Sequence, residues 1–105
     1  MVKLFRRRVD WVLADGVERH ALSPSTFRIV DDEAKAALRE GDRVKVMVVP
    51  SEGLAERLWV VVSSVGDEVL HGTFASDAVE LRGLHAGDVV TFERRHVLGI
   101  GRRDA

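Results

Sequence analysis

The motif Leu-x-x-Gly-Asp occurs twice in this chain, and it constrains the fold more than any other feature. Each copy leads into a valine-rich run. We expect the leucine to anchor a short turn in the core, the glycine to end that turn with a positive φ, and the aspartate to bond the turn backbone. The motif therefore predicts two corners at which strands of one small bent sheet begin. Its residues are Leu38, Gly41 and Asp42 in the first copy and Leu84, Gly87 and Asp88 in the second.

The length and composition predict a single domain over residues 1–105. A chain of 105 residues with 46% hydrophobic side chains can build one core but is too short for two. No run approaches the roughly 18 apolar residues that a membrane span needs, and the N-terminus shows no secretory signal. Since the chain has no cysteine, we exclude disulfides and a thiol nucleophile and expect a cytoplasmic location. The sequence leaves the oligomeric state open.

The charges nearly cancel, with 16 basic and 17 acidic residues, so no overall field attracts nucleic acid or anionic lipid. Arginine clusters occur near both ends, at residues 6–8, 94–95 and 102–103. If the termini lie close together, these clusters form one phosphate-binding patch. Few aromatic residues accompany them. Weak nucleic-acid binding is therefore only the third functional hypothesis, and a solvated rim is the simpler interpretation.

Two short helices are expected in the N-terminal half. Residues 10–22 space apolar side chains at roughly helical intervals, with Asp10 as N-cap and Pro24 beyond the end, although Gly16 weakens the pattern. A second helix of about two turns is expected after Asp31 or Asp32, either of which can cap its start, with acidic residues in its first turn and Gly41 just past its end. Between the two, the alternation around Phe27 predicts a short strand.

From residue 42 the pattern changes to strands. Residues 42–50 alternate valines with charged residues, which predicts a half-buried strand. The run over residues 56–65 is apolar on both faces through Val62, which predicts a central strand covered on both sides. A Gly66-Asp67 loop would join that strand to its hairpin partner, and residues 88–97 would form a long last strand.

The predicted hairpin fixes a register. With a two-residue loop, Trp59 pairs with Phe74 and covers the backbone at Gly72, a strand glycine that marks a bulge or a close approach. The apolar residues on either side of Trp59 would then share the opposite face of the sheet with His71. We therefore expect Trp59 to be largely buried.

These elements predict an α+β fold. We expect a small, strongly bent antiparallel sheet of about five strands, a β-roll or partly open barrel, with two short helices. The N-terminal helical segment would cover residues 10–22, and the sheet core would cover residues 42–97.

Four stretches between residues 23 and 97 carry a family resemblance. They are SPSTFRIV, LREGDRVKVMV, ERLWVVVSSVGDEVLHGTF and LRGLHAGDVVTFERRHV. Together they resemble domain of unknown function 2314, an uncharacterised family of small bacterial domains. The most specific parts are residues 56–60, Gly72 and the Gly87-Asp88 pair. The resemblance implies a fold and no activity, and the family's frequent Asn-x-Pro turn is replaced here by ASDAV.

No catalytic motif is present: the chain has no Gly-x-Ser-x-Gly elbow, no phosphate-binding glycine loop and no His-Glu-x-x-His helix. We therefore assign no catalytic residue and no cofactor. The histidines stand at positions 20, 71, 85 and 96, too far apart for a local metal motif, so a metal site would need ligands from separate elements.

The most plausible binding residues are Glu56, Arg57, Trp59 and His71. An exposed Trp59 beside a charged pair would offer a stacking platform, whereas the simpler interpretation places Trp59 in the core and the charged pair in a salt bridge at the start of the strand. Our leading hypothesis is a small non-enzymatic interaction domain that binds a protein partner. The alternative is a small-ligand binder or enzyme that uses Trp59 with a histidine.

Overall fold

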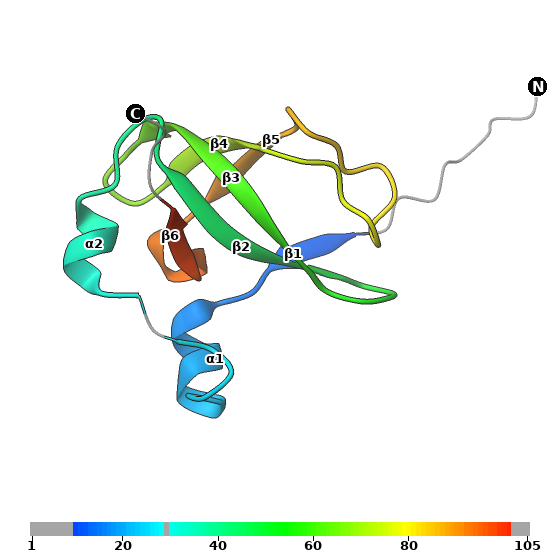
Figure 1. Cartoon of the computed structure of the whole chain (residues 1–105), viewed down its shortest axis with the longest axis horizontal. Helices are drawn as coiled ribbons and strands as arrows, with labels where there is room; N and C mark the ends of the chain where they lie inside the picture. Colours follow the sequence, from blue (N-terminus) through cyan, green and yellow to red (C-terminus); the bar gives the residue numbers. More distant parts are fainter. Residues whose placement is uncertain (1–9, 29, 102–105) are drawn as a thin grey trace, which may run out of the picture.

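A computed structural model describes residues 10–28 and 30–101 of the chain. They form a curled antiparallel sheet, shaped as a half-barrel, with two α-helices beside it (Figure 1). The predicted α+β class with a bent, partly open sheet is therefore confirmed. The strands are β1 Trp11–Leu13, β2 Arg43–Pro50, β3 Glu56–Val65, β4 Leu70–Phe74, β5 Val89–Phe92 and β6 Gly99–Gly101; the helices are α1 Gly16–Leu22, α2 Asp32–Ala36 and the 3-10 helix η1 Arg94–His96.

The sheet contains both ends of the described chain. Its strands follow the order β1-β2-β3-β4-β5, and β6 lies beside β2 as well. β1 pairs with residues 48–50 of β2 and β6 with residues 43–45, so the two short strands occupy one edge of β2 end to end. The sheet thus extends on both sides of the predicted range of residues 42–97.

One face of the sheet builds the core. Alternate residues of β2 and β3 are almost completely buried, as the period of a strand requires. They pack with the aromatic rings of β4 and β5 into one cluster. We call the opposite side the outer face. The buried strand residues are Val44, Val46, Val48, Leu58, Val60, Val62, Leu70, Phe74, Val90 and Phe92.

The first Leu-x-x-Gly-Asp copy forms a corner that enters β2. Leu38 is 4% exposed, and Gly41 has a φ of 92°, as the motif predicts. The carboxylate of Asp42 accepts a hydrogen bond from the Arg39 N–H at 2.8 Å. The corner is also bonded to β3, because the Gly41 N–H donates to the Val62 carbonyl and the Val62 N–H donates to the Asp42 carbonyl, both at 2.8 Å.

The second copy forms the same corner at the start of β5. Leu84 is 5% exposed, and Gly87 has a φ of 90°. The Asp88 carboxylate accepts from the His85 N–H at 2.8 Å. The Gly87 N–H donates to the Phe74 carbonyl at 2.8 Å, and the Phe74 N–H donates to the Asp88 carbonyl at 3.0 Å. The repeat in the sequence is therefore a repeat of one hydrogen-bonded corner.

The N-terminal helix is shorter than residues 10–22 predict. Trp11 belongs to β1, because the open edge of β2 pairs with this apolar segment, and α1 begins only at Gly16. Its N-cap is Asp15 rather than Asp10, and the Asp15 carboxylate accepts two N–H groups of the first turn at 3.0 Å. A β-carbon at Gly16 would lie 2.7 Å from Leu98 Cδ2, so glycine allows α1 to pack closely against the chain after η1.

Three further elements differ from their predictions. The segment around Phe27 is a turn within the described residues, not a strand, and Ile29 lies outside them. The second helix starts as predicted, with Asp31 as N-cap, but ends at Ala36. The strand predicted over residues 88–97 is β5, and it ends at Phe92 because η1 follows it; the Glu93 N–H donates to the His96 side chain there.

The β3–β4 hairpin has a register that the two-residue loop did not predict. Val65 pairs with Leu70, so residues 66–69 form the loop, and the Gly66 N–H donates to the Val69 carbonyl at 2.9 Å. A register shift between Val62 and Ser64 adds a bulge. Both changes move β4 relative to β3.

The new register separates Trp59 from Phe74. Val60 pairs with Phe74 on the core face, whereas Trp59 lies on the outer face and is only partly buried. The predicted Trp59–Phe74 pair and the coverage of β3 on both sides are therefore wrong, and Phe74 instead contacts Trp11 edge-on, with ring centroids 6.1 Å apart. The close approach at Gly72 is real, since a β-carbon there would lie 2.5 Å from the carbonyl oxygen of the neighbouring β3.

Candidate functional site

Glu56 bonds a loop that lies far away in the sequence. From the start of β3 its carboxylate accepts the Val79 N–H, at 3.0 Å to Oε1 and 2.8 Å to Oε2, and the Glu80 N–H at 2.9 Å. These backbone hydrogen bonds, the one from Val79 first, lower the pKa of Glu56. The carboxylate therefore stays charged and holds residues 75–88, the connection from β4 to β5, against the start of β3.

The connection over residues 75–88 is ordered by its own contacts. The Asp77 carboxylate accepts the Ala86 N–H at 2.9 Å, and the Ala78 N–H donates to the Leu84 carbonyl at 3.0 Å. Leu81 and Leu84 are each 5% exposed and join the core. Compact loops that pack on their own side chains in this way are frequently functional.

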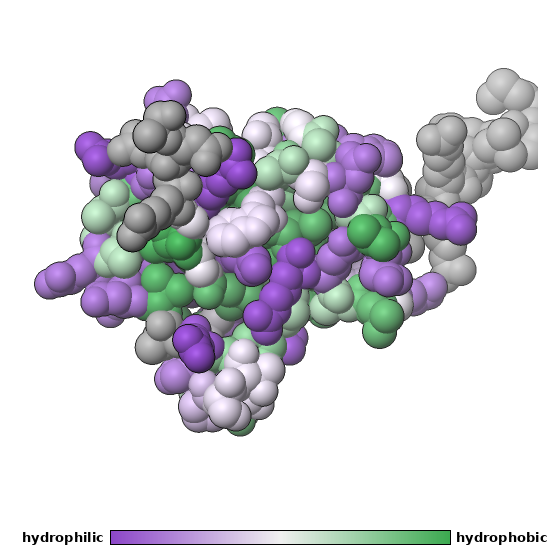
Figure 2. All heavy atoms as spheres, in the orientation of Figure 1, coloured by the Kyte–Doolittle hydropathy of each residue, from purple (hydrophilic) through white to green (hydrophobic). Residues whose placement is uncertain are grey.

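This ordered loop presents an apolar side chain to solvent. Val79 is 86% exposed, and Leu54, in the β2–β3 connection over residues 51–55, is 69% exposed. Both connections lie at the same end of the half-barrel (Figure 1), and hydrophobic atoms are visible at that end in Figure 2. We call residues 51–55 and 75–88 together the loop surface.

Arg57 and Trp59 lie on the outer face, away from Glu56. The guanidinium carbon of Arg57 is 5.0 Å from the centroid of the Phe27 ring, and Lys45 Nζ is 4.7 Å from the Trp59 ring. The predicted charged pair therefore separates: Glu56 bonds backbone groups and Arg57 stacks on an aromatic ring.

Trp59 also has a structural role that the sequence did not reveal. Its strand neighbour on β2 is Lys45, and β6 follows on the other side of β2. A β-carbon at Gly101 would lie 3.2 Å from Trp59 Cζ3. The ring thus extends over β2 and covers the glycine backbone of β6, as aromatic neighbours of strand glycines commonly do.

His71 is not close to Trp59. It is exposed, pairs with Ser64, and its Nδ1 lies 3.1 Å from Thr91 Oγ1. Ser64 lies five positions after Trp59 in β3, which is roughly 15 Å along a strand. The two residues share the outer face, but the structure does not bring them together as the small-ligand alternative requires.

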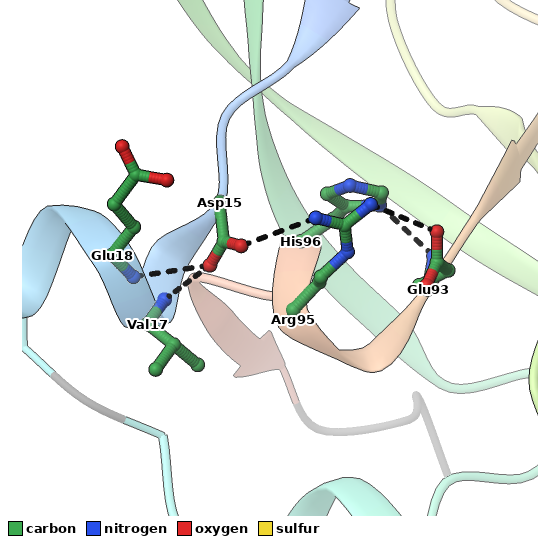
Figure 3. A network of polar contacts seen from close by, with 6 residues as sticks. All are labelled: Asp15, Val17, Glu18, Glu93, Arg95 and His96. Atoms are coloured by element: carbon green, nitrogen blue, oxygen red, sulfur yellow. Dashed lines mark hydrogen bonds and ion pairs between the residues drawn. The ribbon is translucent and has the colours of Figure 1, made fainter.

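A polar network connects α1 to η1 (Figure 3). Arg95 lies 3.3 Å from the Asp15 carboxylate and 3.1 Å from the Glu93 carboxylate. The Glu93 N–H donates to His96 Nδ1 at 3.0 Å, which requires an unprotonated Nδ1. Burial, followed by the nearby charge of Arg95, lowers the pKa of His96. These contacts stabilise the packing of α1 against η1.

The described arginines near the C-terminus make internal contacts. Arg94 donates to the carbonyls of Asp67 and Gly66 at 2.8 and 3.1 Å, so it caps the β3–β4 hairpin. An open depression next to it is lined only by charged residues, unlike the mostly apolar pockets of small-molecule sites. The arginines at 6–8 and 102–103 lie outside the described residues, so the predicted patch is not tested.

The remaining histidines are dispersed. His20 Nδ1 lies 2.6 Å from the Phe27 carbonyl, and His85 Nδ1 lies 3.9 Å from Asp77 on the loop surface. Among residues 10–28 and 30–101, no group of three metal-ligating side chains could hold a metal ion. In the same part of the chain, no helix has the length and apolarity that crossing a bilayer requires.

Comparison with known proteins gives no match: no family model, no curated protein and no solved structure matches the chain. The resemblance to domain of unknown function 2314 therefore stays a prediction. The functional assignment depends on the geometry of the chain itself.

Sequence reasoning missed the loop surface. It singled out Glu56 for its position before Trp59, but the partners of Glu56 are backbone N–H groups more than twenty residues away, which no side-chain pattern marks. One signal was available: the connection over residues 75–88 is long for a compact domain.

Proposed function

We propose that this chain is a non-enzymatic interaction domain that binds a protein partner through the loop surface. The observation that carries this proposal is Val79, a large apolar side chain that is 86% exposed on a backbone held by Glu56. Binding usually costs free energy to order loops, and a loop that is already fixed avoids that cost.

The combination of features supports the proposal more than exposure alone. A single exposed valine on a protein surface needs no functional explanation. Here, however, the carboxylates of Glu56 and Asp77 fix the loop, and Leu54 exposes a second apolar side chain on the adjacent connection. An apolar side chain on a fixed loop, with a second one on the neighbouring connection, has the character of an interface anchor.

Site-specific crosslinking in the source cells tests this function. A photo-crosslinking amino acid at position 79 should capture a discrete partner, whereas the same amino acid at position 17, an exposed valine of α1, should not. Once the partner is identified, Val79→Ser should weaken its binding about tenfold, because a buried interface anchor is lost. Identical crosslinks from both positions, or a dissociation constant that Val79→Ser leaves unchanged, would contradict the proposal.

A further inference from the structure

The outer face carries an uneven distribution of charge. Strand residues alternate between the core and the outer face, and the outer-face positions of β1 to β5 hold Arg43, Lys45 and Arg57 but no aspartate or glutamate. The whole chain, in contrast, has one more acidic than basic residue. The acidic residues are therefore segregated away from this side of the described strands, and hydrophilic side chains cross β2 and β3 in Figure 2.

Two of these cations are held by aromatic rings. Arg57 lies over Phe27 at 5.0 Å, and Lys45 lies over Trp59 at 4.7 Å. Within the described chain, neither cation lies within ion-pair distance of a carboxylate. A cation that is positioned by a ring but has no ionic partner keeps N–H groups for an external acceptor and loses little side-chain entropy on binding.

We propose that the outer face around Arg57 and Lys45 binds an acidic segment of the protein partner. This inference rests on the proposed function and names the chemistry of the bound segment. Arg57 directly follows Glu56 in β3 but points to the opposite face of the sheet. A partner that contacts both the loop surface and the cations must therefore reach around the start of β3.

Charge and geometry favour a peptide over a nucleic acid. Each ring already has a cation over it, with Arg19 also 5.8 Å from Phe27, so the rings are not open platforms for stacked bases. A guanidinium matches the oxygens of a carboxylate and of a phosphate alike, so the occupied rings and the net charge decide between the two. The chain's net charge of −1 gives no long-range attraction for a phosphate polymer.

Titration with three probes tests the inference on the full chain. The probes are a capped octaglutamate peptide, a capped octalysine peptide and octathymidylate, each followed through backbone amide and tryptophan indole signals by NMR. Octaglutamate should shift the signals of Lys45, Arg57 and Trp59, and the shifts should decrease as salt rises from about 25 to about 250 mM. Octalysine should leave them unchanged.

Variants locate the binding. Arg57→Gln and Lys45→Gln should each raise the dissociation constant of octaglutamate about threefold, the effect of one exposed charge pair. The matched control is Arg39→Gln, which removes an exposed cation from the corner before β2, outside the loop surface, and should have no effect. Thermal melts of all three variants confirm that each remains folded.

Several results would overturn the inference. The inference fails if octaglutamate causes no shift, or if Arg39→Gln and Arg57→Gln weaken its binding equally. It also fails if octathymidylate binds more tightly than octaglutamate, a result that would indicate a nucleic-acid surface. The test is separate from that of the proposed function, because octaglutamate has no apolar group for Val79. If position 79 crosslinks to a partner but octaglutamate does not bind, the proposed interaction domain stands and the proposed acidic segment is rejected.

Discussion

The two corners predict a matched pair of mutational effects. Leu38 and Leu84 are 4% and 5% exposed, and both belong to the main core cluster. Truncation of a buried leucine to alanine costs about 2–5 kcal/mol, because transfer free energy is lost and a cavity remains. Since the two side chains occupy the same place in two corners of the same geometry, the two costs should agree to within about 1 kcal/mol.

The magnitude is large enough to measure without ambiguity. For a domain of about this size, each kcal/mol shifts Tm by roughly 4–8 °C, so either substitution should lower Tm by roughly 10 °C or more. Urea unfolding followed by circular dichroism gives the free energy itself, and an unchanged m-value shows that the same surface is exposed. Leu54→Ala is the control: Leu54 is 69% exposed, and its truncation should change stability by less than about 0.5 kcal/mol.

The result that refutes the corner interpretation is asymmetry. If Leu38→Ala leaves the urea midpoint unchanged while Leu84→Ala lowers it, the first copy of the motif does not anchor its turn. The reverse outcome removes the same role from the second copy.

Three further predictions concern backbone and charge. Gly87→Ala should lower the free energy of unfolding, measured with urea, by about 1–2 kcal/mol. Backbone strain alone causes this loss, because φ is 90° and no atom lies within 4 Å of the added carbon. A neutral effect would show that the corner relaxes. Gly72→Ala should cost about 1–3 kcal/mol and more than Val61→Ala, since its β-carbon would lie 2.5 Å from a carbonyl oxygen; the opposite order would contradict the observed β3–β4 register. The pKa of His96 is lowered in the folded state, so its contribution to stability is present above the unfolded value of about 6.5 and is lost as pH falls below it. The lowered pKa of Asp15 adds a second loss below about pH 4. Urea midpoints measured against pH should show both losses, and His96→Gln should remove the first only.

Patterns that depend on local periodicity were predictable. Valines at every second position indicated β2, because side chains that alternate along a strand point to opposite faces, and the buried face takes the apolar ones. The corners were predictable because Gly41 and Gly87 adopt a positive φ, a conformation that other residues adopt only at a cost in free energy.

Features that depend on tertiary pairing were not predictable. The bulge beyond Val62 and the four-residue loop changed the hairpin register. Neither feature has a sequence signal as strong as the Gly66-Asp67 pair, which predicted a two-residue turn. β6 contains two glycines in three residues, a composition that disfavours strands; pairing with β2 and the ring of Trp59 impose its conformation.

The corners also bear on the order in which the chain assembles. The first joins Gly41 to Val62 and the second joins Gly87 to Phe74, so each closes a loop between strands that are neighbours in sequence as well as in space. Closing such loops costs little chain entropy, whereas β1 and β6 must find β2 from opposite ends of the chain. A nucleus made of β2 to β5 can therefore form before the terminal strands dock. We therefore expect the edge of β2 that both terminal strands share to complete last on folding and to open first.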